Sequence, residues 1–203
     1  MLSFLDFLDP ASLIQAFGYI GLFIIIFAES GFLLGFFLPG DSLLFTAGFL
    51  ASQNLLRIEI LLPLLFLAAF TGDSTGYFFG KKTGPKIFSR PKSKFFHPEH
   101  VVKTKKFFES YGSKAIVLAR FIPIVRTFVP IMAGVGEMEY KNFVFYNFIG
   151  ALIWAVGVTL LGYLFGNVVP NADKYMLYII LIIVNVSFIP PLWQFYKEKK
   201  KDL

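Results

Sequence analysis

Residues 121 to 130, FIPIVRTFVP, are apolar enough to lie in a membrane, yet they contain two prolines and Arg126, and Arg120 directly precedes them. Proline removes a helical hydrogen bond, and an arginine is costly in hydrocarbon, so this stretch does not suit an ordinary transmembrane helix. We therefore expect a broken helix whose freed backbone and charged side chains are covered inside the protein.

The rest of the chain has the composition of an integral membrane protein. Its 203 residues are 56% hydrophobic and 16% charged, with a mean hydropathy of +0.68, whereas a soluble domain averages about 25% charged residues. Four runs are apolar over about the 20 residues that a bilayer-spanning helix needs: 11–28, 60–80, 143–166 and 175–196. We predict one all-α polytopic membrane domain over residues 1–203.

Basic residues are concentrated in one loop and at the carboxyl end. Residues 81–114 hold ten Lys and Arg against two acidic residues, and the final eight residues, YKEKKKDL, hold four lysines. The positive-inside rule predicts that both regions are cytoplasmic. Nucleic-acid binding is the alternative for a basic loop, but the loop has no recognisable nucleic-acid motif, and basic juxtamembrane loops are ordinary in membrane proteins. We expect no nucleic-acid partner.

The connecting segments must fit this topology. Residues 115–137 start in the cytoplasm and must return to it, and residues 29–51 face the same constraint from the other side. Both are predicted to be re-entrant hairpins that enter from opposite faces. The order helix, hairpin, helix followed by hairpin, helix, helix indicates an inverted repeat. Residues 41–48, DSLLFTAG, and 127–134, TFVPIMAG, both end in Ala-Gly, which agrees weakly with such a repeat.

Four ionisable residues fall within these hairpins: Glu29 and Asp41 in the first, Arg120 and Arg126 in the second. Each unpaired charge costs about 3 kcal/mol of free energy at mid-bilayer, so these side chains must be ion-paired or in contact with water. The two acids offer partners to the two arginines, and Asp73 in the span 60–80 is a fifth candidate. The simplest interpretation is that these ion pairs only hold the two hairpins together. The functional one is a binding site, because arginine grips phosphate through a planar fork and carboxylates carry protons.

Other patterns have mainly structural interpretations. Four glycines recur every four residues and predict close helix packing, with a lipid groove as the alternative: Gly72, Gly76, Gly80 and Gly84. Asn147 and Trp154 are interpreted as packing residues. His97 and His100 have the spacing of a metal pair, but the chain has no cysteine and no third histidine, so we expect no metal and no cofactor.

Several motifs together resemble one family. ESGFLLGFFLPGDSLLFTAGFLA (29–51), GDSTGYFFGKKTG (72–84), ARFIPIVRTFVPIMAGVGEM (119–138) and FVFYNFIGALIW (143–154) occur in order. In these the chain resembles the DedA family, the bacterial branch of the VTT-domain or SNARE-associated membrane proteins. It departs from many members at Phe36, where they carry a proline.

The resemblance implies two opposed re-entrant hairpins in a bacterial inner-membrane protein, with Glu29, Asp41, Arg120 and Arg126 at the positions of the family's essential acids and basic pair. It implies transport of a lipid such as undecaprenyl phosphate or a phospholipid between leaflets, in the manner of a flippase or scramblase, with dependence on the proton-motive force.

The alternative is a proton-coupled exporter of cations or small solutes, with Glu29, Asp41 and Asp73 as proton carriers. An enzyme such as a lipid phosphatase is not expected, because no membrane-embedded histidine or cysteine exists to serve as nucleophile or base. The residues leave the substrate, the direction of transport and the oligomeric state open.

Overall fold

The computed structural model describes residues 10–32, 38–87, 111–170, 174–175 and 178, and the regular elements in these ranges are all helical. In chain order they are α1 (Pro10–Gly31), α2 (Gly40–Ser52), α3 (Ile58–Ile87), α5 (Ala115–Ala119), α6 (Pro123–Val135), α7 (Tyr140–Ala151), the π-helical turn η3 (Leu152–Val156) and α8 (Gly157–Val168). The predicted all-helical class is confirmed for these residues.

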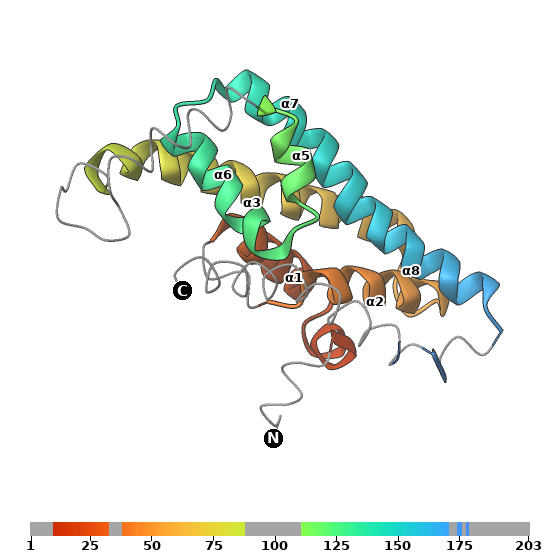
Figure 1. Cartoon of the computed structure of the whole chain (residues 1–203). Helices are drawn as coiled ribbons and strands as arrows, with labels where there is room; N and C mark the ends of the chain where they lie inside the picture. Colours follow the sequence, from red (N-terminus) through yellow and green to blue (C-terminus); the bar gives the residue numbers. More distant parts are fainter. Residues whose placement is uncertain (1–9, 33–37, 88–110, 171–173, 176–177, 179–203) are drawn as a thin grey trace, which may run out of the picture.

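Within the described residues, two helices are long and apolar enough to cross a membrane: Ile58–Gly84 within α3, and Tyr140–Val168, where α7, η3 and α8 form one continuous rod (Figure 1). They match the predicted spans 60–80 and 143–166. The predicted span 11–28 differs, because Gly18 takes a positive φ of 56° and breaks α1, leaving Gly18–Gly31 as a shorter apolar helix. Glycine adopts this left-handed conformation without steric cost. The predicted span 175–196 lies almost wholly outside the described residues.

Prolines and glycines mark the breaks that the sequence predicted. Pro39 is the N-cap of α2, and Gly40 begins the helix. Pro123 occupies the first turn of α6 after an extended Ile122, which suits proline because the first helical N–H has no partner within the helix. Pro130 lies inside α6 and has no N–H to bond to the carbonyl of Arg126, one turn earlier.

The helices cross at glycines. A Cβ atom added to Gly48 of α2 would lie 1.9 Å from the carbonyl oxygen of Thr159 in α8, and one added to Gly162 of α8 would lie 2.0 Å from the carbonyl oxygen of Phe45 in α2. No side chain fits in so close an approach, so both positions require glycine. The α2 helix therefore packs along α8, although the two helices are far apart in the sequence.

The predicted glycine stripe lies along α3 where this helix meets α1 and α6. Gly72 faces the backbone of Phe27 in α1, and Gly76 lies between Gly31 at the end of α1 and Ile131 of α6. Gly80 faces the carbonyl of Ile131, and Gly84 packs against Val135 of the same helix. The stripe thus lets α3 approach both neighbours closely.

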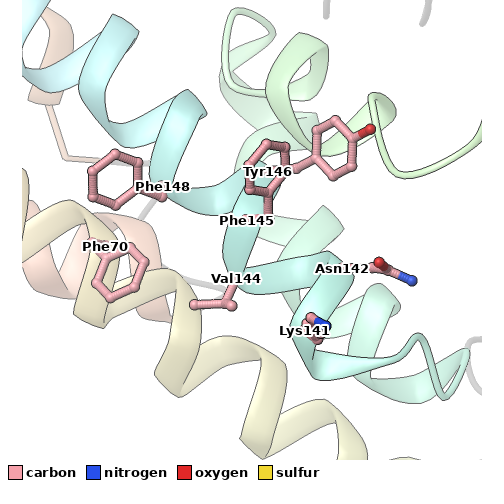
Figure 2. Close-up of a pocket in the computed structure, with 7 residues that line it drawn as sticks. All are labelled: Phe70, Lys141, Asn142, Val144, Phe145, Tyr146 and Phe148. Carbon is pink, nitrogen blue, oxygen red and sulfur yellow. The ribbon is translucent and has the colours of Figure 1, made fainter.

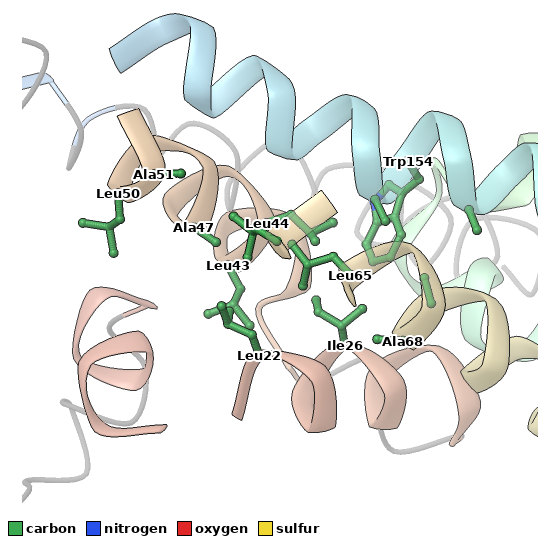
Figure 3. Packing of buried hydrophobic residues seen from close by; sticks show 14 of the residues in the cluster. Leu22, Ile26, Leu43, Leu44, Ala47, Leu50, Ala51, Leu65, Ala68 and Trp154 are labelled. Carbon is green, nitrogen blue, oxygen red and sulfur yellow. The ribbon is translucent and has the colours of Figure 1, made fainter. Parts of the chain in front are cut away.

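A buried apolar cluster joins α1, α2 and α3 to the rod. Leu22 and Ile26 of α1 meet Leu43 and Leu44 of α2 and residues of α3, and Trp154 lies at its edge (Figure 3). Outside the core, large apolar side chains are strongly exposed on several helices, among them Ile20, Leu118, Leu161 and Val168. Exposed apolar surface of this extent is normal where lipid, rather than water, is the solvent.

Candidate functional site

The first buried charged cluster is built around Arg126, in the first half of α6. Its Nη1 donates a hydrogen bond of 2.7 Å to Oδ1 of Asp41, in the first turn of α2. Its Nη2 donates to Oε1 of Glu29, near the end of α1. One guanidinium thus ties together three helices, two of them from the amino-terminal part of the chain. We call this group the Arg126 cluster.

The second cluster lies around Arg120, which caps the short helix α5. Its Nη2 donates to Oδ2 of Asp73 in α3 and, over 2.5 Å, to Oδ1 of Asn147 in α7. The amide of Asn147 is held in turn, since its Nδ2 donates to the carbonyl of Phe70 over 3.0 Å and to Ser74 Oγ over 3.4 Å. This group is the Arg120 cluster.

Both clusters are withdrawn from the surface. Glu29 is 0% exposed, Asp73 3%, Arg120 4% and Arg126 9%, whereas the side chain of Asp41 keeps 23% of its exposure. Burial is expensive for charged groups unless opposite charges and hydrogen bonds compensate for the lost water. Within the described part of the chain, Oε2 of Glu29 and Nε of both arginines have no hydrogen-bond partner.

Trp154 connects the two clusters. Its Nε1 donates a 2.6 Å hydrogen bond to Oδ1 of Asp41. Its ring lies 4.6 Å from Cζ of Arg126 and 5.8 Å from Cζ of Arg120, within the range of a cation–π interaction. Trp154 occupies the middle of η3, the single π-helical turn of the rod.

The structure corrects two expectations drawn from the sequence. Both arginines were expected to pair with Glu29 and Asp41, but Arg126 takes both of these carboxylates and Arg120 pairs with Asp73. Asn147 and Trp154 are not ordinary packing residues, because each makes hydrogen bonds to a charged group. They are seven residues apart, which is two helical turns, so their shared helix face was the available sequence signal.

A pocket of about 360 Å³ adjoins both clusters. Asp41 and Arg120 supply its charged groups, and Trp154 contributes an indole. The remaining walls are apolar: Phe45, Phe121, Val158 and Leu161. Charged groups beside an apolar wall suit a ligand that has an anionic head and a hydrocarbon tail.

A second pocket, of about 520 Å³, lies between α3 and α7 (Figure 2). Its lining is largely aromatic: Phe70, Phe145, Tyr146 and Phe148, beside Val144, Lys141 and Asn142. Lys141 and Asn142 are exposed, and no carboxylate contributes to the lining. This pocket therefore lacks the buried charges that distinguish the first one.

The described residues contain no group of three or more His, Asp or Glu side chains placed to hold a metal ion. His97 and His100, the pair considered from sequence, lie outside the described residues. The contacts within the two charged clusters include ion pairs between arginines and carboxylates.

Comparison with known proteins identifies the family to which the chain belongs. The VTT domain model matches residues 38–164. Protein DedA of Escherichia coli K12 is 45% identical over 195 residues, covering 94% of this chain and 89% of its own length. This chain belongs to the DedA family.

Two further relatives match at lower identity. The membrane protein Rv0364 of Mycobacterium tuberculosis is 43% identical, with 92% of this chain and 85% of its own length covered. The inner membrane protein YqjA of Escherichia coli is 32% identical, with 77% and 71% covered. No solved structure matches the chain. The names of these relatives agree with a bacterial membrane protein.

Proposed function

We propose that this DedA-family protein moves a phosphate-bearing lipid, such as undecaprenyl phosphate or a phospholipid, between membrane leaflets without chemical change. The observation that carries the proposal is the pocket in which Arg120 and Asp41 adjoin apolar walls. A lipid phosphate needs a cation that is shielded from water and an apolar path for its tail. In this pocket the buried Arg120 lies beside apolar walls.

Arginine supplies the chemistry for a phosphate head group. Its planar guanidinium donates parallel hydrogen bonds to two phosphate oxygens, which the point charge of lysine does not. At rest Asp41 accepts from Nη1 of Arg126 and Glu29 accepts from Nη2. A phosphate that reaches the site replaces a carboxylate at the guanidinium, and the returning carboxylate releases the lipid.

The proposed architecture is an inverted repeat of two re-entrant hairpins, around 29–51 and 115–137. Reciprocal packing supports it: Gly48, which ends the first Ala-Gly pair, meets α8, and Gly134, which ends the second, meets the carbonyl of Tyr77 in α3. The long helices echo each other too, as GYFFG (76–80) and GYLFG (162–166). The predicted basic loop 81–114 begins within α3, which continues to Ile87, and we place this basic segment and the carboxyl end in the cytoplasm.

Proton coupling is the second part of the proposal. Glu29, Asp41 and Asp73 are the carboxylates that face the two arginines. A carboxylate that takes up a proton no longer holds its arginine by charge, so protonation frees the guanidinium for a lipid phosphate. Imposing a pH gradient across proteoliposomes should therefore change the rate of lipid exchange.

The decisive test uses purified protein in liposomes, scored for leaflet exchange of labelled polyprenyl phosphate and, separately, labelled phospholipid. Arg126→Lys keeps the charge and loses the fork, and Arg126→Ala loses both, so exchange should fall in both variants. Lys141→Gln removes an exposed cation from the second pocket and should leave exchange unchanged. Unimpaired exchange by both Arg126 variants would eliminate the phosphate role.

A proton-coupled exporter of cations or small solutes is the second candidate. It is favoured by Glu29, whose carboxylate is fully buried and whose Oε2 has no hydrogen-bond partner among the described residues. Vesicles that contain the protein but no candidate lipid should then show a pH change when a transported cation is added. Lipid exchange without such a change favours the lipid transporter.

A further inference from the structure

Trp154 lies at an irregularity in the rod formed by α7, η3 and α8. The helical residues from Tyr140 to Val168 are α-helical except for Leu152–Val156, where the turn is π-helical. The N–H of Gly157 reaches back five residues to the carbonyl of Leu152. A π turn is less favourable than an α turn and occurs frequently at functional sites. Here it surrounds a tryptophan that is 2% exposed.

The indole offers two different interactions at once. Its edge donates a hydrogen bond to Asp41, and its face lies near both guanidinium groups. Asp41 is thus shared, since the same Oδ1 accepts from Arg126 over 2.7 Å and from Trp154 over 2.6 Å. Trp154 also lines the pocket of about 360 Å³.

This sharing matters when an anion replaces Asp41 at the guanidinium. A partly buried carboxylate that loses its cation is strongly destabilised unless another donor remains. We propose that Trp154 is a positioning residue: it retains its hydrogen bond to Asp41 while an anionic lipid head group binds the guanidinium of Arg126. The inference rests on the proposed function, because it assigns Trp154 a part in phosphate binding at that site.

The direct test measures the binding of dodecyl phosphate, a single-chain phosphate monoester, to the purified full chain by calorimetry. Trp154→Phe keeps an aromatic face and removes the N–H, and should weaken binding about tenfold, the worth of one hydrogen bond to a charged group. Tyr146→Phe is the matched control, because it removes a polar group from an aromatic side chain of the same rod at the second pocket. Its affinity should equal that of the wild type.

A double-mutant comparison separates positioning from simple packing. In the Asp41→Ala background, Trp154→Phe should cost less than about twofold, because the oxygen that accepts the indole N–H has gone. A tryptophan that only fills space would weaken binding equally in both backgrounds, and that result would overturn the inference.

Fluorescence gives an independent signature. Trp154 and Trp193 are the two tryptophans of the chain, so Trp193→Phe leaves Trp154 as the sole indole emitter. Dodecyl phosphate should shift its emission, whereas uncharged dodecanol should not.

The outcomes distinguish the two proposals. If the wild type binds dodecyl phosphate but neither the emission of Trp154 nor the affinity of Trp154→Phe changes, the role of Trp154 is wrong and the phosphate site stands. If the wild type does not bind dodecyl phosphate at all, the phosphate site and the role of Trp154 both fall.

Discussion

The Arg126 and Arg120 clusters use the same type of cation but differ in charge balance. Within the described residues, Arg126 faces two carboxylates, Glu29 and Asp41, whereas Arg120 faces one, Asp73, together with the neutral amide of Asn147. The first cluster has a negative charge in excess, and the second is balanced. Because Arg126 has a second carboxylate, an anion can replace Asp41 while Glu29 still faces the arginine, whereas Arg120 has no second carboxylate among the described residues.

The clusters also differ in what they present to the pocket. The Arg126 cluster contributes a carboxylate to the lining, because Asp41 keeps part of its exposure, whereas the Arg120 cluster contributes Arg120. Under the proposed function, an incoming phosphate would meet Arg120 beside Asp41 and would have to displace Asp41 to reach Arg126. In that proposal the Arg120 cluster attracts the phosphate, and the Arg126 cluster exchanges Asp41 for it. Mutations can test this difference.

The largest expected effect comes from removing each arginine. Arg120→Ala leaves one buried carboxylate unpaired and should lower the free energy of unfolding by about 3 to 5 kcal/mol. Arg126→Ala leaves two carboxylates facing each other and should lower it further. Denaturant unfolding in micelles, followed by circular dichroism, measures both. The control is Arg57→Ala, whose contact with Glu59 is 4.0 Å long and exposed, and it should cause no measurable loss. Equal losses for the two buried arginines would contradict the difference in charge balance.

Neutralising one carboxylate in each cluster should give unequal results. Glu29→Gln balances the Arg126 cluster and keeps an oxygen to accept from Nη2, so we expect a change of less than about 1 kcal/mol in the free energy of unfolding. Asp73→Asn leaves Arg120 as an uncompensated buried cation and should cost about 3 kcal/mol or more. The same unfolding measurement applies. A greater loss from Glu29→Gln than from Asp73→Asn would reverse the assignment of the excess charge.

The smallest effect concerns the glycines that make room for each cluster. A Cβ added to Gly40 would lie 1.5 Å from Oε2 of Glu29, whereas one added to Gly150 would lie 2.8 Å from Cδ and Nε of Arg120. Gly40→Ala should therefore destabilise by about 1 to 3 kcal/mol, and Gly150→Ala by less. Gly157→Ala is the control, because its Cβ would meet nothing within 4 Å, and helix propensity predicts a gain of up to about 1 kcal/mol. Thermal unfolding of the three variants should follow this order.

Composition and periodicity could predict the helical class, the two long helices and the breaks at Pro39 and Pro123, because these follow from local properties of the chain. The cost of a charge in hydrocarbon could also identify the buried ionisable residues as a group. It could not decide which carboxylate meets which arginine. Pairing depends on how α3 and α6 lie side by side, and that packing is set by contacts distant in sequence, such as Gly80 with Ile131.

Asn147 and Trp154 show a different limit. Their spacing places them on one helix face, but nothing in the local sequence separates a packing role from a hydrogen bond to a charged group. The π turn that surrounds Trp154 has no sequence signal comparable to proline or glycine. Only the fold places its indole N–H against Asp41.

The crossing of α2 with α8 has a consequence for how the protein is made. Nearly all of α2 is buried, and its main cover is the helix that the ribosome completes last among those the structure describes. Throughout most of translation, α2 must therefore wait without its permanent neighbour, and a chain cut short before α8 would offer that bare helix to the insertion machinery and to membrane proteases. Quality control would thus sense a missing carboxyl half through the exposure of the amino half.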